Sequence, residues 1–131
     1  MNQTVTPFLM FQGRAEEAAN LYVATIPDAQ VLATERWGKG EPGPEGAFKM
    51  ARLKLGDLEV VCFDSPMPHG FSFTPSMSLL VVCRDEAEID RVAGVLAEGG
   101  STLMPLGDHG FSRKFTWLND RFGVSWQLNL P

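Results

Sequence analysis

The chain has 131 residues, of which 44% are hydrophobic and 21% are charged, the composition of an ordinary globular domain. Its formal net charge is −5 at pH 7. We expect no nucleic-acid partner, because neutralising phosphates needs clustered basic side chains, and only Arg113 and Lys114 are adjacent.

The N-terminus and the apolar segments predict a cytoplasmic protein with no membrane partner. Residues 1–4 (MNQT) lack the basic stretch and apolar run of a signal peptide. No apolar segment approaches the roughly 20 residues that span a bilayer. Cys62 and Cys83 lie in strand-like runs without the spacing of a zinc site or redox pair, so we expect buried free thiols.

The first half of the chain predicts a strand, a helix and three more strands. Apolar residues recur at helical spacing before Pro27, and Gly56-Asp57 suits a tight turn. The glycine- and proline-rich segment 38–46 predicts a mobile hairpin loop. The expected elements are a strand at 5–11, a helix at 14–26 and strands at 30–37, 48–55 and 58–64.

The second half repeats this order after a linker at 65–75. Asp85 with Glu88 three residues later resembles a capping box, and Gly99-Gly100 ends the helix. Strands are expected at 76–83, 102–106, 113–118 and 124–130. Neither half could bury its sheet alone, so we predict one α+β domain over 1–131, with units at about 5–64 and 76–130.

Three stretches carry a family resemblance: residues 7–22, residues 64–75 and residues 117–128. In them the chain resembles the PhnB-like branch of the glyoxalase/bleomycin-resistance/vicinal-oxygen-chelate superfamily. The resemblance implies a glyoxalase-like fold, in which tandem βαβββ units form a cupped mixed sheet with helices on its outer face. It covers nearly the whole chain.

Members of this branch often carry a 3-demethylubiquinone-9 3-methyltransferase label, which the residues do not support. A methyl donor of the S-adenosylmethionine type is usually held by a glycine-rich turn in a doubly wound sheet. Here the first strand leads into Gln12-Gly13-Arg14, and the alternation of strands and helices that such a sheet needs is absent.

The resemblance also implies where metal-dependent members place their ligands. The first-strand positions fall on Pro7 and Ser78, and the last-strand position of the second unit falls on Gln127. The last strand of the first unit offers Cys62 or Asp64. Since zinc prefers Cys, His and carboxylate donors, we expect no metal of the superfamily type and no other cofactor.

Gln127 is the first candidate for binding a ligand. Alternation along residues 124–130 puts Ser125, Gln127 and Asn129 on one face and apolar residues on the other. The apolar face suits packing under the helices, so the polar face should line the cup. There Gln127 either orients a ligand or bonds backbone and water, and Ser78 is its expected neighbour.

The remaining candidates are Asp64, His69 and Trp117. Asp64 ends a strand, where it could hold a polar substrate group or start a turn. His69 and His109 each open the tetrapeptide His-Gly-Phe-Ser, for which loop hydrogen bonding competes with a catalytic or metal role. Trp117 could wall a pocket or pack in the core.

These observations predict a metal-independent protein that binds a small apolar or amphiphilic molecule and pairs as a homodimer. The alternative is an enzyme of the same superfamily, such as an isomerase, a lyase or the labelled methyltransferase. It would use side-chain or improvised-metal chemistry, with Asp64 or His69 as the base.

Overall fold

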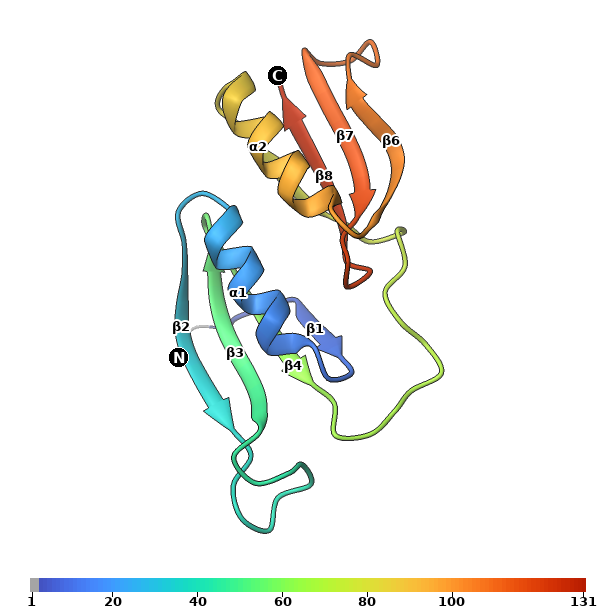
Figure 1. Cartoon of the computed structure of the whole chain (residues 1–131). Coiled ribbons are helices and arrows are strands. Elements are labelled where there is room, and N and C mark those ends of the chain that lie inside the picture. Colours follow the sequence, from blue (N-terminus) through green and yellow to red (C-terminus); the bar gives the residue numbers. More distant parts are fainter. Residues whose placement is uncertain (1–2) are drawn as a thin grey trace. The chain divides into compact units, whose positions relative to one another are not determined.

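The computed structural model describes residues 3–131 and divides the chain into two compact units, one ending at Gly70 and the other beginning at Phe71 (Figure 1). The division falls inside the predicted linker. Each unit has the order strand, helix, three strands, so the predicted β-α-β-β-β repeat is confirmed.

The first unit forms a four-stranded mixed sheet in the order β1-β4-β3-β2. Strand β1 is parallel to β4, whereas β3 pairs antiparallel with both β4 and β2. Helix α1 crosses one face of this sheet (Figure 1). The elements are β1 (Phe8–Phe11), α1 (Ala15–Thr25), β2 (Ala29–Arg36), β3 (Phe48–Leu55) and β4 (Leu58–Asp64).

The second unit repeats this topology in its own four-stranded sheet, with the order β5-β8-β7-β6. Its parallel pair is β5 with β8, and helix α2 packs on β7, β8 and β6. The elements are β5 (Leu79–Val82), α2 (Glu86–Ala97), β6 (Ser101–Gly107), β7 (Lys114–Asn119) and β8 (Ser125–Leu130).

Each helix buries one face of its own sheet, as strand alternation predicts. In the first unit, Tyr22 of α1 and the strand residues Leu53, Val60 and Cys62 are fully buried. In the second unit, Ile89, Val92 and Leu96 of α2 pack with the apolar side of β8, where Trp126, Leu128 and Leu130 are at most 3% exposed. The predicted division of β8 into an apolar and a polar face is confirmed.

One local prediction needs correction. The first strand of each unit is shorter than expected, four residues in place of seven or eight. The loop at 38–46, whose mobility stays a prediction, folds onto Trp37, whose backbone bonds to Gly46 and Ala47. Gly43 lies so close to the Trp37 indole that a Cβ atom would overlap the ring. Glycine is therefore needed there for close packing.

Candidate functional site

Four side chains form a hydrogen-bonded strip on the face of the second sheet opposite α2. Trp117 donates its Nε1–H to Ser125 Oγ at 3.0 Å. Ser125 Oγ and Ser78 Oγ are 2.6 Å apart, and Gln127 Nε2 donates to Ser78 Oγ at 3.4 Å. This polar strip brings together three of the predicted ligand residues, Ser78, Trp117 and Gln127.

The register of the second sheet explains why these residues meet. Strand β8 lies between β5 and β7, and Trp117 is directly opposite Gln127 across β7 and β8. On the other side of β8, Leu80 is opposite Gln127. Ser78 immediately precedes β5 and so reaches Ser125. Parallel pairing of β5 with β8 therefore assembles a strip from residues about 50 positions apart.

The strands of the second sheet contribute no charged side chain to the face that carries the polar strip. Lys114 is the single charged residue in β5 to β8, and its Nζ pairs with Asp90 and Glu86 of α2, on the opposite face. Hydrogen bonds to Asp90 and then Glu86 raise the pKa of Lys114. Beside the strip, Leu80 and Val82 are each 61% exposed. The face thus joins neutral hydrogen-bonding groups to exposed apolar side chains.

Ser125 is the member of the strip that the sequence analysis did not single out. It is 2% exposed and connects Trp117 to Ser78. Strand alternation had placed it on the face of Gln127. The sequence could not reveal its role, because a buried serine that joins two hydrogen bonds resembles any other serine in a strand.

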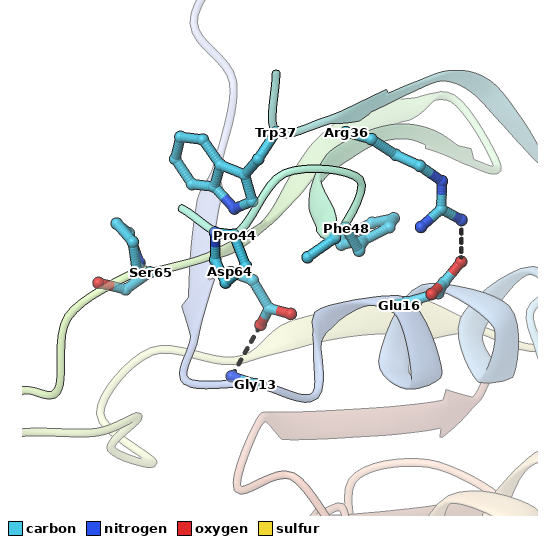
Figure 2. A pocket seen from close by; sticks show the side chains of 10 residues that line it. Gly13, Glu16, Arg36, Trp37, Pro44, Phe48, Asp64 and Ser65 are labelled. Carbon is cyan, nitrogen blue, oxygen red and sulfur yellow. Dashed lines mark hydrogen bonds and ion pairs between the residues drawn. The ribbon is translucent and has the colours of Figure 1, made fainter. Parts of the chain in front are cut away.

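A separate cavity of about 520 Å³ lies in the first unit, at the start of α1. Figure 2 shows Trp37, Pro44 and Phe48 along one side, with Ser65 at one end, the Arg36–Glu16 pair at the other, and Asp64 between them beside Gly13. The remaining lining residues are Gly13, Ala47 and Pro66. The cavity has apolar walls and polar ends.

Asp64 of this cavity holds the start of α1. Its Oδ1 accepts the backbone N–H of Gly13 at 2.9 Å (Figure 2). The same oxygen accepts the backbone N–H of Ala15 at 3.0 Å. The residue at the N-cap position, Arg14, makes no side-chain capping bond. Helix starts leave unpaired N–H groups, so a carboxylate here stabilises α1. Asp64 therefore has a structural role that the sequence analysis did not assign.

The two histidines form loop hydrogen bonds. His69 Nε2 lies 2.8 Å from Ser65 Oγ, and its backbone N–H donates to Gln12 Oε1 at 2.8 Å. His109 Nε2 lies 2.7 Å from the carbonyl oxygen of Pro105, to which it donates. Asp108, beside it, accepts the N–H of Gly110. Loop hydrogen bonding, the simpler of the two interpretations, describes these contacts.

The register of the first sheet shows which side chains face α1 and which face away from it. Leu9 is opposite Cys62 and Phe11 is opposite Asp64, so these four side chains lie on the α1 side. Cys62 and Asp64 were the two candidates for the ligand position on the last strand of the first unit. Both therefore point toward α1 and away from the opposite face of the sheet. Alternation also puts Pro7 on the α1 side. The residues of β1 and β4 that face away from α1 are the apolar Phe8, Met10, Val61 and Phe63.

The donors around these positions do not suit a divalent metal. Within the described part of either unit, no three His, Cys, Asp or Glu side chains converge on one point. Ser78 and Gln127, which occupy two of the ligand positions, contribute neutral oxygen and nitrogen atoms. Zinc and iron sites are built from imidazole, thiolate and carboxylate groups.

Comparison with known proteins gives the family. The model of the 3-demethylubiquinone-9 3-methyltransferase family matches residues 3–129. The chain belongs to this family. A putative 3-demethylubiquinone-9 3-methyltransferase, PhnB protein, from Bacillus cereus is 48% identical, and the match covers 98% of this chain and 100% of that one with a TM-score of 0.92. Protein PA1353 from Pseudomonas aeruginosa is 30% identical over 98% of each chain, with a TM-score of 0.80.

The fold extends to more distant proteins. A glyoxylase/bleomycin resistance protein/dioxygenase domain from Frankia sp. EAN1pec has a TM-score of 0.66 at 15% identity, covering 99% of this chain and 92% of that one. The predicted glyoxalase-like fold and the PhnB-like resemblance are thus confirmed. Among residues 3–131, no helix is long and apolar enough to cross a membrane.

The stretch 117–128 that carried the resemblance has a structural centre in Asp120, which is 2% exposed. Its Oδ1 accepts the N–H groups of Phe122 and Val124 at 2.9 and 3.0 Å. Its Oδ2 accepts Trp126 Nε1–H at 2.9 Å. Asp120 thereby fixes the turn that leads into β8. The position of Gln127 and Ser125 on that strand depends on this turn.

Proposed function

We propose that the chain is a metal-independent protein that binds a small apolar or amphiphilic molecule at the polar strip of its second unit. The observation that carries this proposal is the convergence of Ser78, immediately before β5, with Trp117 of β7 and Gln127 of β8, on a face to which the strands contribute no charged side chain. Binding sites commonly combine apolar surface with a few converging polar groups.

The exposed apolar side chains support this choice of ligand. Leu80 and Val82 stand beside the strip, and burying such side chains contributes about 1.5–3 kcal/mol each. Gln127 and Ser78 then orient the ligand by hydrogen bonds. Asp64, a predicted ligand residue, holds α1 in the first unit.

A thermal-shift screen against aromatic and amphiphilic compounds tests the proposal, because a ligand that binds the folded state raises the melting temperature. We expect Gln127→Ala and Ser78→Ala each to weaken binding of a compound found in this way by about tenfold. Gln30→Ala, which removes an exposed glutamine from β2, is the matched control and should leave affinity unchanged. Equal affinity in all four proteins would place the ligand elsewhere.

The metal-independent part is tested separately by elemental analysis of protein purified without added metal. We expect zinc, iron and manganese far below one equivalent per chain, and ligand affinity that is unchanged by a chelator. About one equivalent of any of these metals, lost together with ligand binding on chelation, would contradict the proposal.

A second candidate function, an enzyme with side-chain chemistry, rests on the cavity of the first unit. Asp64 and Ser65 line that cavity, and His69 contacts Ser65 at 2.8 Å. A serine beside a histidine is the arrangement that general-base catalysis requires. However, Ser65 Oγ also bonds to the backbone of Met67, which is typical of a turn. Turnover abolished by both Ser65→Ala and His69→Gln would favour the enzyme.

We also propose that the protein pairs as a homodimer through a sheet edge. Strand β2 at one edge of the first sheet and β6 at one edge of the second present mostly exposed residues. Unpaired edge strands invite pairing with another chain. Light scattering coupled to gel filtration should give about twice the 14.4 kDa mass of the chain. A proline placed at Leu103 in β6 tests whether that edge is used.

A further inference from the structure

We infer that the polar strip presents one hydrogen-bond donor beside one acceptor, and that its ligand carries a neutral lactam or amide on an apolar body. The inference rests on the proposed function and narrows it to a chemical class. It follows from which group donates and which accepts in each hydrogen bond that joins Trp117, Ser125, Ser78 and Gln127.

Trp117 fixes which group donates in the first of these hydrogen bonds. An indole N–H can donate and cannot accept, so Ser125 Oγ is the acceptor of the 3.0 Å bond. Ser125 is 2% exposed and must use its own hydrogen within the protein. The acceptor within reach is Ser78 Oγ, at 2.6 Å. Ser125 therefore donates to Ser78.

Ser78 then receives two hydrogen bonds, one from Ser125 and one from Gln127 Nε2 at 3.4 Å. Because both acceptor positions of the hydroxyl oxygen are in use, its hydrogen remains for an outside acceptor. Ser78 is only half-buried, so a ligand can reach it. Within residues 3–131, Gln127 Oε1 accepts no hydrogen bond. Ser78 thus offers a donor next to the acceptor of Gln127.

A ligand that satisfies both atoms needs an acceptor adjacent to a donor, which a lactam or primary amide provides. A carboxylate has no donor for Gln127 Oε1, and the strands contribute no cation to this face. Leu80 lies opposite Gln127 and is 61% exposed, and it would contact the apolar part of such a ligand. A neutral amide on an apolar ring matches both features.

Three bicyclic probes of the same shape test the inference by NMR titration of the full chain. Oxindole carries the N–H and C=O groups side by side, 2-indanone keeps the C=O alone, and indane has neither. The readouts are the Trp117 indole N–H and the Gln127 side-chain amide signals. We expect oxindole to bind about tenfold more tightly than 2-indanone, and indane more weakly still.

Variants identify which atom makes each bond. Gln127→Glu keeps the shape but cannot donate to Ser78, so the Ser78 hydroxyl turns inward and the preference for oxindole disappears. Ser78→Ala should bring the affinity of 2-indanone close to that of indane, and Ser78→Thr should restore the difference. Gln30→Glu is the control for charge and leaves all three affinities unchanged.

Two results would overturn the inference. Equal binding of oxindole and 2-indanone would mean that the Gln127 amide presents its nitrogen outward, and the lactam assignment would be wrong. The second result would be a screened compound without an amide that binds and shifts the Gln127 signals, while oxindole leaves those signals unchanged. That result would also overturn the inference. In both cases the proposed function stands. The proposed function itself fails only when no compound in the wider screen depends on Gln127 or Ser78.

Discussion

The two helices begin in different ways, although the two units share one topology. Helix α2 is capped by its own N-cap residue, Asp85, whose side chain accepts the N–H of Glu88 at 2.8 Å. Helix α1 has no such local cap. The N–H of its first residue, Ala15, and that of Gly13 just before the helix both bond to Asp64, which lies about 50 residues further along the chain.

The difference explains why the sequence revealed one cap and not the other. A local cap leaves a short-range pattern, Asp85 followed three residues later by Glu88, which predicts a helix start. A long-range cap leaves no such pattern. A carboxylate at the end of β4 suggested a ligand residue, whereas its two hydrogen bonds are made to backbone. The comparison therefore separates residues that stabilise their own turn from residues that connect distant elements.

The buried carboxylate Asp120 gives the largest expected effect and extends the comparison to a third acid. Asp120→Ala removes the acceptor of three hydrogen bonds at a 2% exposed site. We expect a loss of about 3 kcal/mol in the free energy of unfolding, measured by urea denaturation.

Asp120→Asn is the matched control. Its amide oxygen can still accept from Phe122 and Val124, but its NH₂ group would face the Trp126 indole N–H, which also donates. The loss should therefore be intermediate. A wild-type value for either variant would contradict the role assigned to Asp120.

Asp64→Ala should have the next largest effect, a loss of about 2 kcal/mol in the free energy of unfolding. The substitution removes the hydrogen bonds to Gly13 and Ala15 at the start of α1, together with the favourable charge. Asp64→Asn keeps an acceptor oxygen, so we expect a loss of less than about 1 kcal/mol. If Asp64 were instead a catalytic base, the Asn variant would be fully stable and have no activity.

Asp85→Ala should lower the free energy of unfolding by about 1 kcal/mol in urea denaturation, since a single local hydrogen bond is lost at an exposed helix start. Asp85→Ser retains a capping oxygen and should recover most of that loss. A larger effect for Asp85→Ala than for Asp64→Ala would reverse the comparison between the two helix starts.

The smallest expected effect concerns Cys83, which immediately follows β5. Burial raises the pKa of this thiol from 9.0 to about 11, and Glu88 contributes to the same shift. Below pH 9 both the folded and the unfolded chain keep the proton. Between pH 9 and 11 only the unfolded chain loses it, so stability falls as the pH rises.

We expect this thiol to reduce the free energy of unfolding by ~0.8 kcal/mol at pH 9.5 relative to pH 7. The measurement is urea denaturation at the two pH values, compared with Cys83→Ala, in which that part of the pH dependence disappears. An identical pH dependence in both proteins would show that the thiol does not contribute.

Most of the fold could be predicted from the sequence. Residues 48–55 and 58–64 were assigned as strands with the bounds that the structure shows, because Gly56-Asp57 marks the turn between them. The first strands were overextended, since apolar residues such as Val5 continue beyond the paired segment. The prediction that both units form one domain stays a prediction.

The candidate site was predictable in part. Alternation along β8 placed Gln127 on the polar face, and its pairing with Ser78 in the structure agrees with that expectation. Asp64 and His69, proposed for the same site, belong to the first unit, where they bond to Gly13 and Ser65. The alternation of residues along one strand predicts which face each side chain occupies. It does not predict which strands become neighbours in the sheet.

The sequence by itself determined the two repeated units, the capping of α2 and the polar face of β8, because each depends on residues a few positions apart. The tertiary structure decided the cap of α1, the role of Asp120 and the order of hydrogen bonds from Trp117 to Gln127. These depend on which strands become neighbours. That choice is made by packing between distant segments, and it leaves no periodic pattern in the chain.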